Sequence, residues 1–183
     1  MAYIGKIPTP VPLTSGDITD GIISTAKIAD DAVTTAKAAF AAGKVLQVSQ
    51  DSLTSQFSTT STSFITTGLD INFTPSLASS KVLISFYLNQ YAISSNTVTF
   101  YTIYRDSTSL GDTSEDTNGV GLVRGYTNVH HGYPMGLTFL DTPNTTSQIH
   151  YDVYARTNSG TLHIGGSGGY AIPNYIQCFE IGA

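Results

Sequence analysis

The residues with the most obvious potential for chemistry begin with an acidic cluster in the second half of the chain. Asp112, Glu115 and Asp116 are followed by Asn118 and Gly119. Carboxylate and amide oxygens are the ligands that calcium prefers, but the cluster lacks the D-x-[DN]-x-[DN]-G order and the closing glutamate of a calcium loop. The spacing therefore favours a solvated loop over a metal site.

The four histidines form no shared set of metal ligands. His130 and His131 are adjacent, and neighbouring residues of a strand point to opposite faces of a sheet. His150 and His163 each stand alone in a strand-like segment. We expect hydrogen-bonded histidines at the surface or in an interface. The alternative is zinc on a trimer axis, where one histidine from each chain would supply three ligands.

The remaining reactive groups also lack partners for catalysis. Cys178, the single cysteine, lies in the apolar run 175–179 and is expected to be a buried packing residue. The glycine-rich run 165–169 is not followed by the lysine and helix of a phosphate loop. Five carboxylates show no spacing typical of an acid–base pair: Asp70, Asp106, Asp141, Asp152 and Glu180. The sequence predicts a protein that is not an enzyme and has no cofactor or metal.

A low content of charge excludes further classes of function. Charged residues make up 11% of the chain, against about 25% in an average protein, and Ser, Thr, Asn and Gly take their place. The net charge is −5 and the eight Lys and Arg residues form no stripe, which argues against nucleic-acid binding. No apolar run approaches the ~18 residues of a membrane-spanning helix. We expect a neutral, hydrogen-bonding surface of the kind found outside cells and on particles.

A repeat of ten residues occupies positions 16–39, GDITDGIISTAKIADDAVTTAKAA. The segment 24–27 recurs as 34–37, and an aspartate stands four residues before each copy, at Asp20 and Asp30. Short helices are expected at 25–29 and 34–42, with caps at Ser24 or Thr25 and at Thr34 or Thr35. Helices of this length are marginal in water, so the repeat needs neighbours, which with only two copies are expected to be identical chains.

This repeat resembles segments of fibre and virion surface proteins of tailed bacteriophages, including cyanophages. The resemblance rests on the tandem pattern D-G-x-I-x-T-A-K-I-A-D-x-A-V-T-T-A-K. It extends more loosely through residues 68–71, 74–76, 79–83 and 179–181. The resemblance implies a homotrimer that is fixed to the phage particle by its N-terminal part, with a β-rich head outside. Its partners would be itself and capsid or tail proteins, and its location the virion surface. The N-terminus also lacks a signal-peptide pattern, as expected of a protein released by virus assembly and lysis.

Two domains are expected: an attachment arm and trimeric stalk at 1–43, and a head at 44–183. Pro8, Pro10 and Pro12 keep the arm extended. Apolar residues around them are expected to anchor the arm to the virion: Tyr3, Ile4, Ile7, Val11 and Leu13. In the stalk, five apolar residues are expected to face a three-fold axis: Ile18, Ile22, Ile23, Ile28 and Val33.

From Lys44 onward the pattern predicts an all-β domain. Residues 81–91 are expected to form a long strand, and strong β formers fill the segment 98–104. Further strands are expected at 44–50, 63–67, 69–74, 120–125, 134–140, 147–156, 161–165 and 174–181, with turns between them. Nine or ten strands without a convincing helix indicate a jelly-roll-like antiparallel sandwich. Several strands carry large apolar residues on both faces, so a neighbouring subunit is expected to cover one of them.

Two placements and one rival function follow from the sequence. The protein would be either a head fibre or capsid decoration protein, or a short tail fibre. The rival is a module that binds a host receptor or carbohydrate through aromatic, amide and imidazole groups on loops. One stretch supplies such a set: Tyr126, Asn128, His130, His131 and Tyr133. A solvated loop or a trimer contact would account for the same residues.

Overall fold

The computed structural model describes residues 14, 28, 43–92, 97–111, 123–127, 132–165 and 173–182. The chain divides into two units, Met1–Phe40 and Ala41–Ala183. Of the first unit only Thr14 and Ile28 are described, and both are exposed. The expected arm and the helices of the expected stalk therefore lie outside the described residues. Over the described ranges, no helix is long and apolar enough to cross a membrane.

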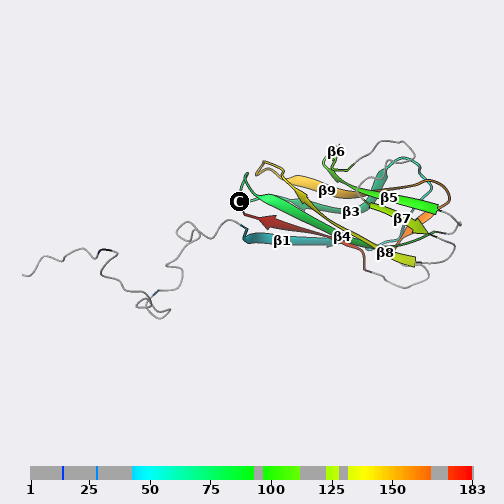
Figure 1. Cartoon of the computed structure of the whole chain (residues 1–183), viewed down its shortest axis with the longest axis horizontal. Coiled ribbons are helices and arrows are strands. Elements are labelled where there is room, and N and C mark those ends of the chain that lie inside the picture. Colours follow the sequence, from blue (N-terminus) through cyan, green and yellow to red (C-terminus); the bar gives the residue numbers. More distant parts are fainter. Residues whose placement is uncertain are drawn as a thin grey trace, which may run out of the picture. The chain divides into compact units, whose positions relative to one another are not determined.

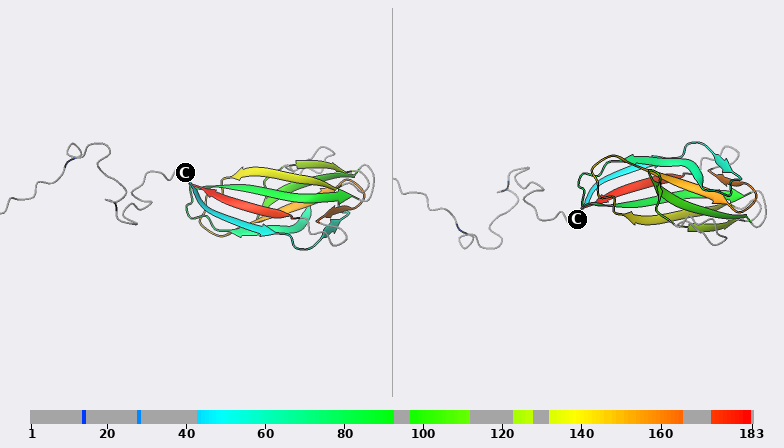
Figure 2. Two further views of the ribbon diagram at one scale, coloured as in Figure 1. Left: turned by 90° about the horizontal axis from the view of Figure 1, so that it is seen from below. Right: turned by 90° about the horizontal axis from the view of Figure 1, so that it is seen from above.

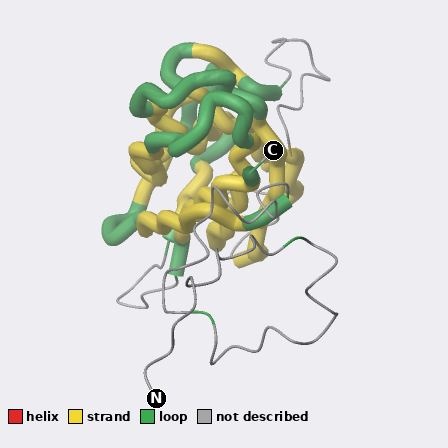
Figure 3. The backbone as a smooth tube through the Cα atoms, turned by 90° about the vertical axis from the view of Figure 1, so that its left-hand side faces the viewer, coloured by secondary structure: helices red, strands yellow, loops and turns green. Residues whose placement is uncertain are grey.

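The second unit consists of two antiparallel sheets packed face to face (Figures 1 and 2), and its described residues contain no helix (Figure 3). Sheet A is formed by β1 (Val45–Ser52), β2 (Phe57–Thr59), β4 (Lys81–Ala92), β8 (Gly132–Asp141), β10 (Leu162–Ile164) and β11 (Tyr175–Ile181). Sheet B is formed by β3 (Ile65–Phe73), β5 (Thr97–Arg105), β6 (Thr108–Ser109), β7 (Val123–Thr127) and β9 (Ile149–Thr157).

The strand order identifies the architecture. In sheet A, β4 pairs with β8 along one edge and with β11 and β10 along the other. β11 pairs in turn with β1, and β10 pairs with β2. In sheet B, β9 lies between β3 and β5, and β5 also pairs with β7 and β6. The principal orders are β1–β11–β4–β8 and β3–β9–β5–β7, the arrangement of an eight-stranded jelly roll. The predicted fold class of the head is confirmed.

Alternation along the strands builds the core between the sheets. In β4, Val82, Ile84 and Phe86 are buried, whereas the residues between them are only half-buried on the outer face. Cys178 belongs to the core cluster and burial raises the pKa of its thiol to about 12, so the expectation of a packing cysteine is confirmed. Removal of these apolar side chains from water is the main stabilising term.

The strand predictions differ from the structure at three places. Segments 63–67 and 69–74 were expected as two strands but form the single strand β3, interrupted by a register shift between Thr66 and Leu69. Gly68 has φ 75° at this irregularity, a conformation that glycine adopts without strain. The pattern does not predict β2 or β6, whose three and two residues are too few to show alternation.

A polar contact joins the two sheets inside the sandwich. Arg105 of β5 and Asp141 of β8 form an ion pair at 2.9 Å, and the Tyr151 hydroxyl of β9 donates to Asp141 at 2.7 Å. Burial and the bond to Asp141 raise the pKa of Tyr151, which keeps its hydroxyl protonated as the donor. The carboxylate thus has charged and neutral partners from the opposite sheet, which offsets the cost of burying it.

The chain enters and leaves the head at one end. The Gly43 amide donates to the Gly182 carbonyl at 2.6 Å, and the Gly182 amide donates to the Lys44 carbonyl at 2.8 Å. β1 begins and β11 ends beside these bonds, where Figure 1 marks the C-terminus. Residues 1–42 are therefore connected to the head at this end of sheet A.

Candidate interaction surfaces

Most residues of the predicted functional sets lie outside the described part of the chain. This holds for the arm residues Tyr3, Ile4, Ile7, Val11 and Leu13, and for the stalk residues Ile18, Ile22, Ile23 and Val33. Ile28 is described and 39% exposed. These assignments remain predictions.

The expected glycan set is only partly described. Asn128, His130 and His131 lie outside the described residues. Tyr126 and Tyr133 were expected on loops, but the structure places both on strands. Tyr126 lies in β7, opposite Val98 of β5, and Tyr133 lies in β8, opposite Gln90 of β4. The two strands belong to different sheets and lie near each other at one edge of the sandwich. The strand pairing extends further than the turn residues of this region suggest.

The outer face of sheet A carries a continuous line of apolar side chains. Strand register places Val48, Phe179, Leu83 and Leu140 side by side across β1, β11, β4 and β8, and we call this set the apolar row. Val48 is 57% exposed and Leu140 48% exposed, while the two central residues are half-buried. Val45, 47% exposed, pairs with Ile181 in the adjoining position. The row spans the full width of the sheet at the end where the chain enters.

The rest of this face carries few charges. The next outward position pairs Gln50 with Gln177, whose side chains are hydrogen-bonded at 2.6 Å. Beyond it, Tyr87 stacks on Tyr175 with ring centroids 5.6 Å apart. Among the outward strand residues that the structure describes on sheet A, Lys81 alone is charged.

His163 differs from the expectation of a hydrogen-bonded histidine. Its ring stacks on Tyr91 with centroids 4.6 Å apart, and both ring nitrogens are buried without a hydrogen-bond partner. Burial lowers the pKa of His163, which favours the neutral ring. Both residues are close to the end of β4 that is remote from the apolar row.

The outer face of sheet B is ionic and aromatic instead. Arg156 lies over the ring of Phe100 at 4.1 Å and over that of Phe64 at 5.3 Å, and Arg124 lies over Phe100 at 5.8 Å. These guanidinium groups gain from the negative ring faces and shield the aromatic carbons from water.

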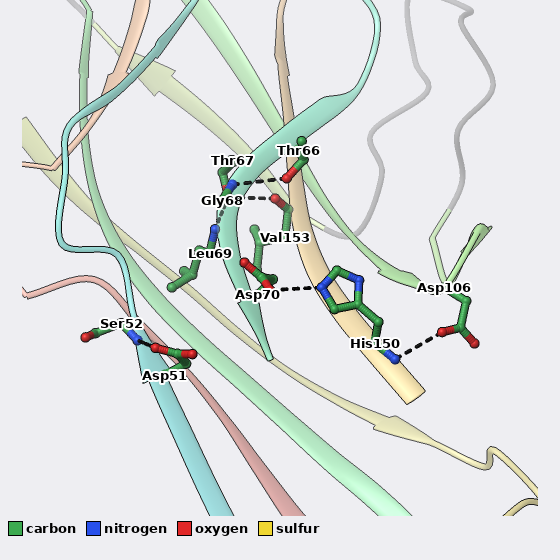
Figure 4. Close-up of polar contacts among 10 residues, drawn as sticks. All are labelled: Asp51, Ser52, Thr66, Thr67, Gly68, Leu69, Asp70, Asp106, His150 and Val153. Atoms are coloured by element: carbon green, nitrogen blue, oxygen red, sulfur yellow. Dashed lines mark hydrogen bonds and ion pairs between the residues drawn. The ribbon is translucent and has the colours of Figure 1, made fainter. Parts of the chain in front are cut away.

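Carboxylates meet on sheet B in a pairing that sequence spacing does not reveal. Asp70 of β3 and Asp152 of β9 are directly opposite, and His150 contacts Asp70 at 2.9 Å. The His150 amide donates to Asp106 at 3.0 Å, and Figure 4 shows the imidazole between the Asp70 and Asp106 side chains. Within the described residues, no group of three or more such side chains is placed to hold a metal ion.

Asp152 is buried in an unfavourable electrostatic position. It is 6% exposed, and one of its carboxylate oxygens has no hydrogen-bond partner. Burial raises the pKa of Asp152 to about 6, and the charge of Asp70 adds to this, against the effects of a Thr66 hydrogen bond and of His150. The pKa in the folded state lies above the unfolded value of about 4. The contribution of Asp152 to the stability of the fold is therefore fully present at low pH and is lost as pH rises towards 6.

The variant Asp152→Asn is therefore expected to raise the free energy of unfolding at pH 7 by ~1–3 kcal/mol, with little change at pH 4. Denaturant unfolding followed at both pH values measures this. Asp106→Asn is the matched control, because an asparagine tolerates the φ of 53° at that position and still accepts the His150 amide. A variant Asp152→Asn less stable than the parent at pH 7 would contradict the assignment.

Comparisons with known proteins add a likeness of fold. No protein-family model matches the chain. No curated protein matches it either. Among solved structures, it is similar to a particle of infectious bursal disease virus at 14% identity and a TM-score of 0.42. It is also similar to that virus's VP2 subviral particle (15%, TM-score 0.39) and to the virus of the Gt strain (16%, TM-score 0.39).

Each of these alignments covers 75% of this chain and between 36% and 38% of the viral chain. The chain thus spans less than two fifths of the length of the structures that it matches.

Proposed function

We propose that this chain is a non-enzymatic structural protein of a tailed-phage virion. It forms a homotrimer on the particle surface, with a jelly-roll head displayed outward and the N-terminal arm, residues 1–43, bound to the particle. The observation that carries the proposal is the tandem repeat at 16–39, which needs identical neighbours and directly precedes the β-sandwich head.

The ionisable groups of the head support a structural role. Asp141 is held by Arg105 and Tyr151, and burial raises the pKa of the Cys178 thiol to about 12, so the thiolate nucleophile is scarce at neutral pH. On sheet B, Arg156 is engaged with aromatic rings and Asp70 with His150. These contacts hold the fold together and leave no nucleophile beside a base among them.

The length of the arm favours a capsid decoration or head fibre over a tail fibre. Forty-three fully extended residues reach at most ~140–150 Å. That span is sufficient to lie across neighbouring capsid subunits, as a capsid decoration or head fibre requires.

Electron microscopy of purified particles labelled with an antibody against the head tests this proposal. Particles from lysates that carry the coding sequence should be labelled at regular positions on the capsid, and particles from lysates in which it is deleted should not. Label confined to the tail would move the protein to a tail fibre. Absence of the chain from purified, intact particles would show that it is not a virion protein.

A further inference from the structure

The two outer faces of the head differ in how their apolar side chains are shielded from water. On sheet B, Arg156 and Arg124 lie over the ring of Phe100, and Asp70 contacts His150. On sheet A, the apolar row has no such cover among the described residues, and Val48 and Leu140 at its ends are about half exposed. Depletion of charge around exposed apolar residues distinguishes the centre of a protein interface from ordinary surface.

The apolar row is a built feature rather than a scatter of surface residues. Isolated exposed apolar side chains are normal, but contiguous ones require an explanation. Here four strands that are neighbours in the sheet each contribute one residue in register. Val45 and Ile181 extend the row at the edge of β1. Cross-strand neighbours of this kind lie close enough to form one surface.

We infer that the apolar row of sheet A packs against other copies of this chain. This inference rests on the homotrimer proposed above and names the surface of the head that takes part in it. Residues close to a three-fold axis meet their own copies, so like charges there would repel each other, and a nearly neutral face is favoured at that position. Among its described outward residues, sheet A carries only Lys81 as a charge.

The position of the row also favours a second copy over an unrelated partner. The chain enters the head at Gly43, two residues before Val45, and its amide is bonded to Gly182 beside the last residue of β11. The repeat that requires identical neighbours is joined to the head through this end. If the repeats of several copies associate, the ends of the heads that carry the apolar row are brought close to one another.

Thiol reactivity of the full chain tests the inference. The native Cys178 is fully buried and should not react with a thiol reagent in the folded protein. Val48→Cys and Leu140→Cys place a thiol at the exposed ends of the row. Asn72→Cys on the outer face of sheet B and Ser58→Cys on the remote part of sheet A are matched controls at exposed strand positions. Alkylation by iodoacetamide at Val48→Cys and Leu140→Cys should be slower by ~10-fold or more than at the controls, because it requires the interface to open.

Sedimentation of the same samples separates the possible failures. If the protein is a trimer and all four thiols react at similar rates, the inference is overturned while the homotrimer stands. If the protein is a monomer, the homotrimer of the proposed function is overturned as well. Protection that persists when the trimer is diluted to monomers would show that a segment of the same chain covers the row, which also overturns the inference.

Discussion

Replacing Glu180 with glutamine is expected to lower the free energy of unfolding by ~2–3 kcal/mol at pH 7. The buried carboxylate accepts from the Ser76 amide and hydroxyl at 2.9 and 2.8 Å, from the Leu77 amide at 3.2 Å and from Gln47 at 2.6 Å. An amide group in its place would turn N–H groups towards these donors. Both oxygens are engaged, so rotation of the glutamine does not restore the lost bonds.

The pH dependence identifies the cause of this loss. Burial acts to raise the pKa of Glu180, but the hydrogen bonds from Ser76 and Gln47 outweigh it and lower the pKa to about 2. The folded value is below the unfolded value of about 4.3, so the stabilisation is present above that pH and is lost as pH falls towards 2.

Denaturant titrations of Glu180→Gln should therefore converge on those of the parent protein at low pH. Asp51→Asn, an exposed carboxylate on β1, is the control and should change stability by no more than ~0.5 kcal/mol. Equal stability of parent and Glu180→Gln at pH 7 would refute the role of this carboxylate.

The double variant Ile4→Asp/Ile7→Asp is expected to abolish most of the protein's occupancy on virions while leaving the free trimer intact. Burial of an apolar side chain contributes ~1.5–3 kcal/mol, and an aspartate in its place would have to be buried without a partner. The three arms of one trimer bind together, so the loss is repeated in every arm.

Quantification of the protein in purified particles measures the effect. Thr9→Asp/Thr14→Asp adds the same charge to the same segment without removing an apolar residue, and it should retain occupancy. If the Ile4→Asp/Ile7→Asp protein is found on particles at the parental level, the arm is not the anchor.

The fold of the head was largely predictable because its strands show strong local signals. β5 consists of β-branched and aromatic residues over nearly its whole length. In β4 a regular alternation of apolar and more polar positions separates the core from the outer face. Gly68 was misleading, since a glycine between two apolar stretches suggests a break, and the structure uses it for an irregularity inside β3. The very short strands β2 and β6 are defined by their partners rather than by their own residues.

The surface features depend on register, which a single sequence does not contain. Alternation predicts that Val48, Leu83 and Leu140 point away from the core, but the row exists only because four strands pair in one register. The same limit applies to Asp70 and Asp152, which lie far apart in the sequence and meet across β3 and β9. Residue types indicate what each position favours, whereas strand pairing decides which positions meet.

The central claim is that this chain works as a homotrimer, and multi-angle light scattering of the full-length protein at micromolar concentration tests it most directly. The account predicts a mass three times that of the 19.4 kDa chain. A mass equal to one chain at this concentration would contradict it.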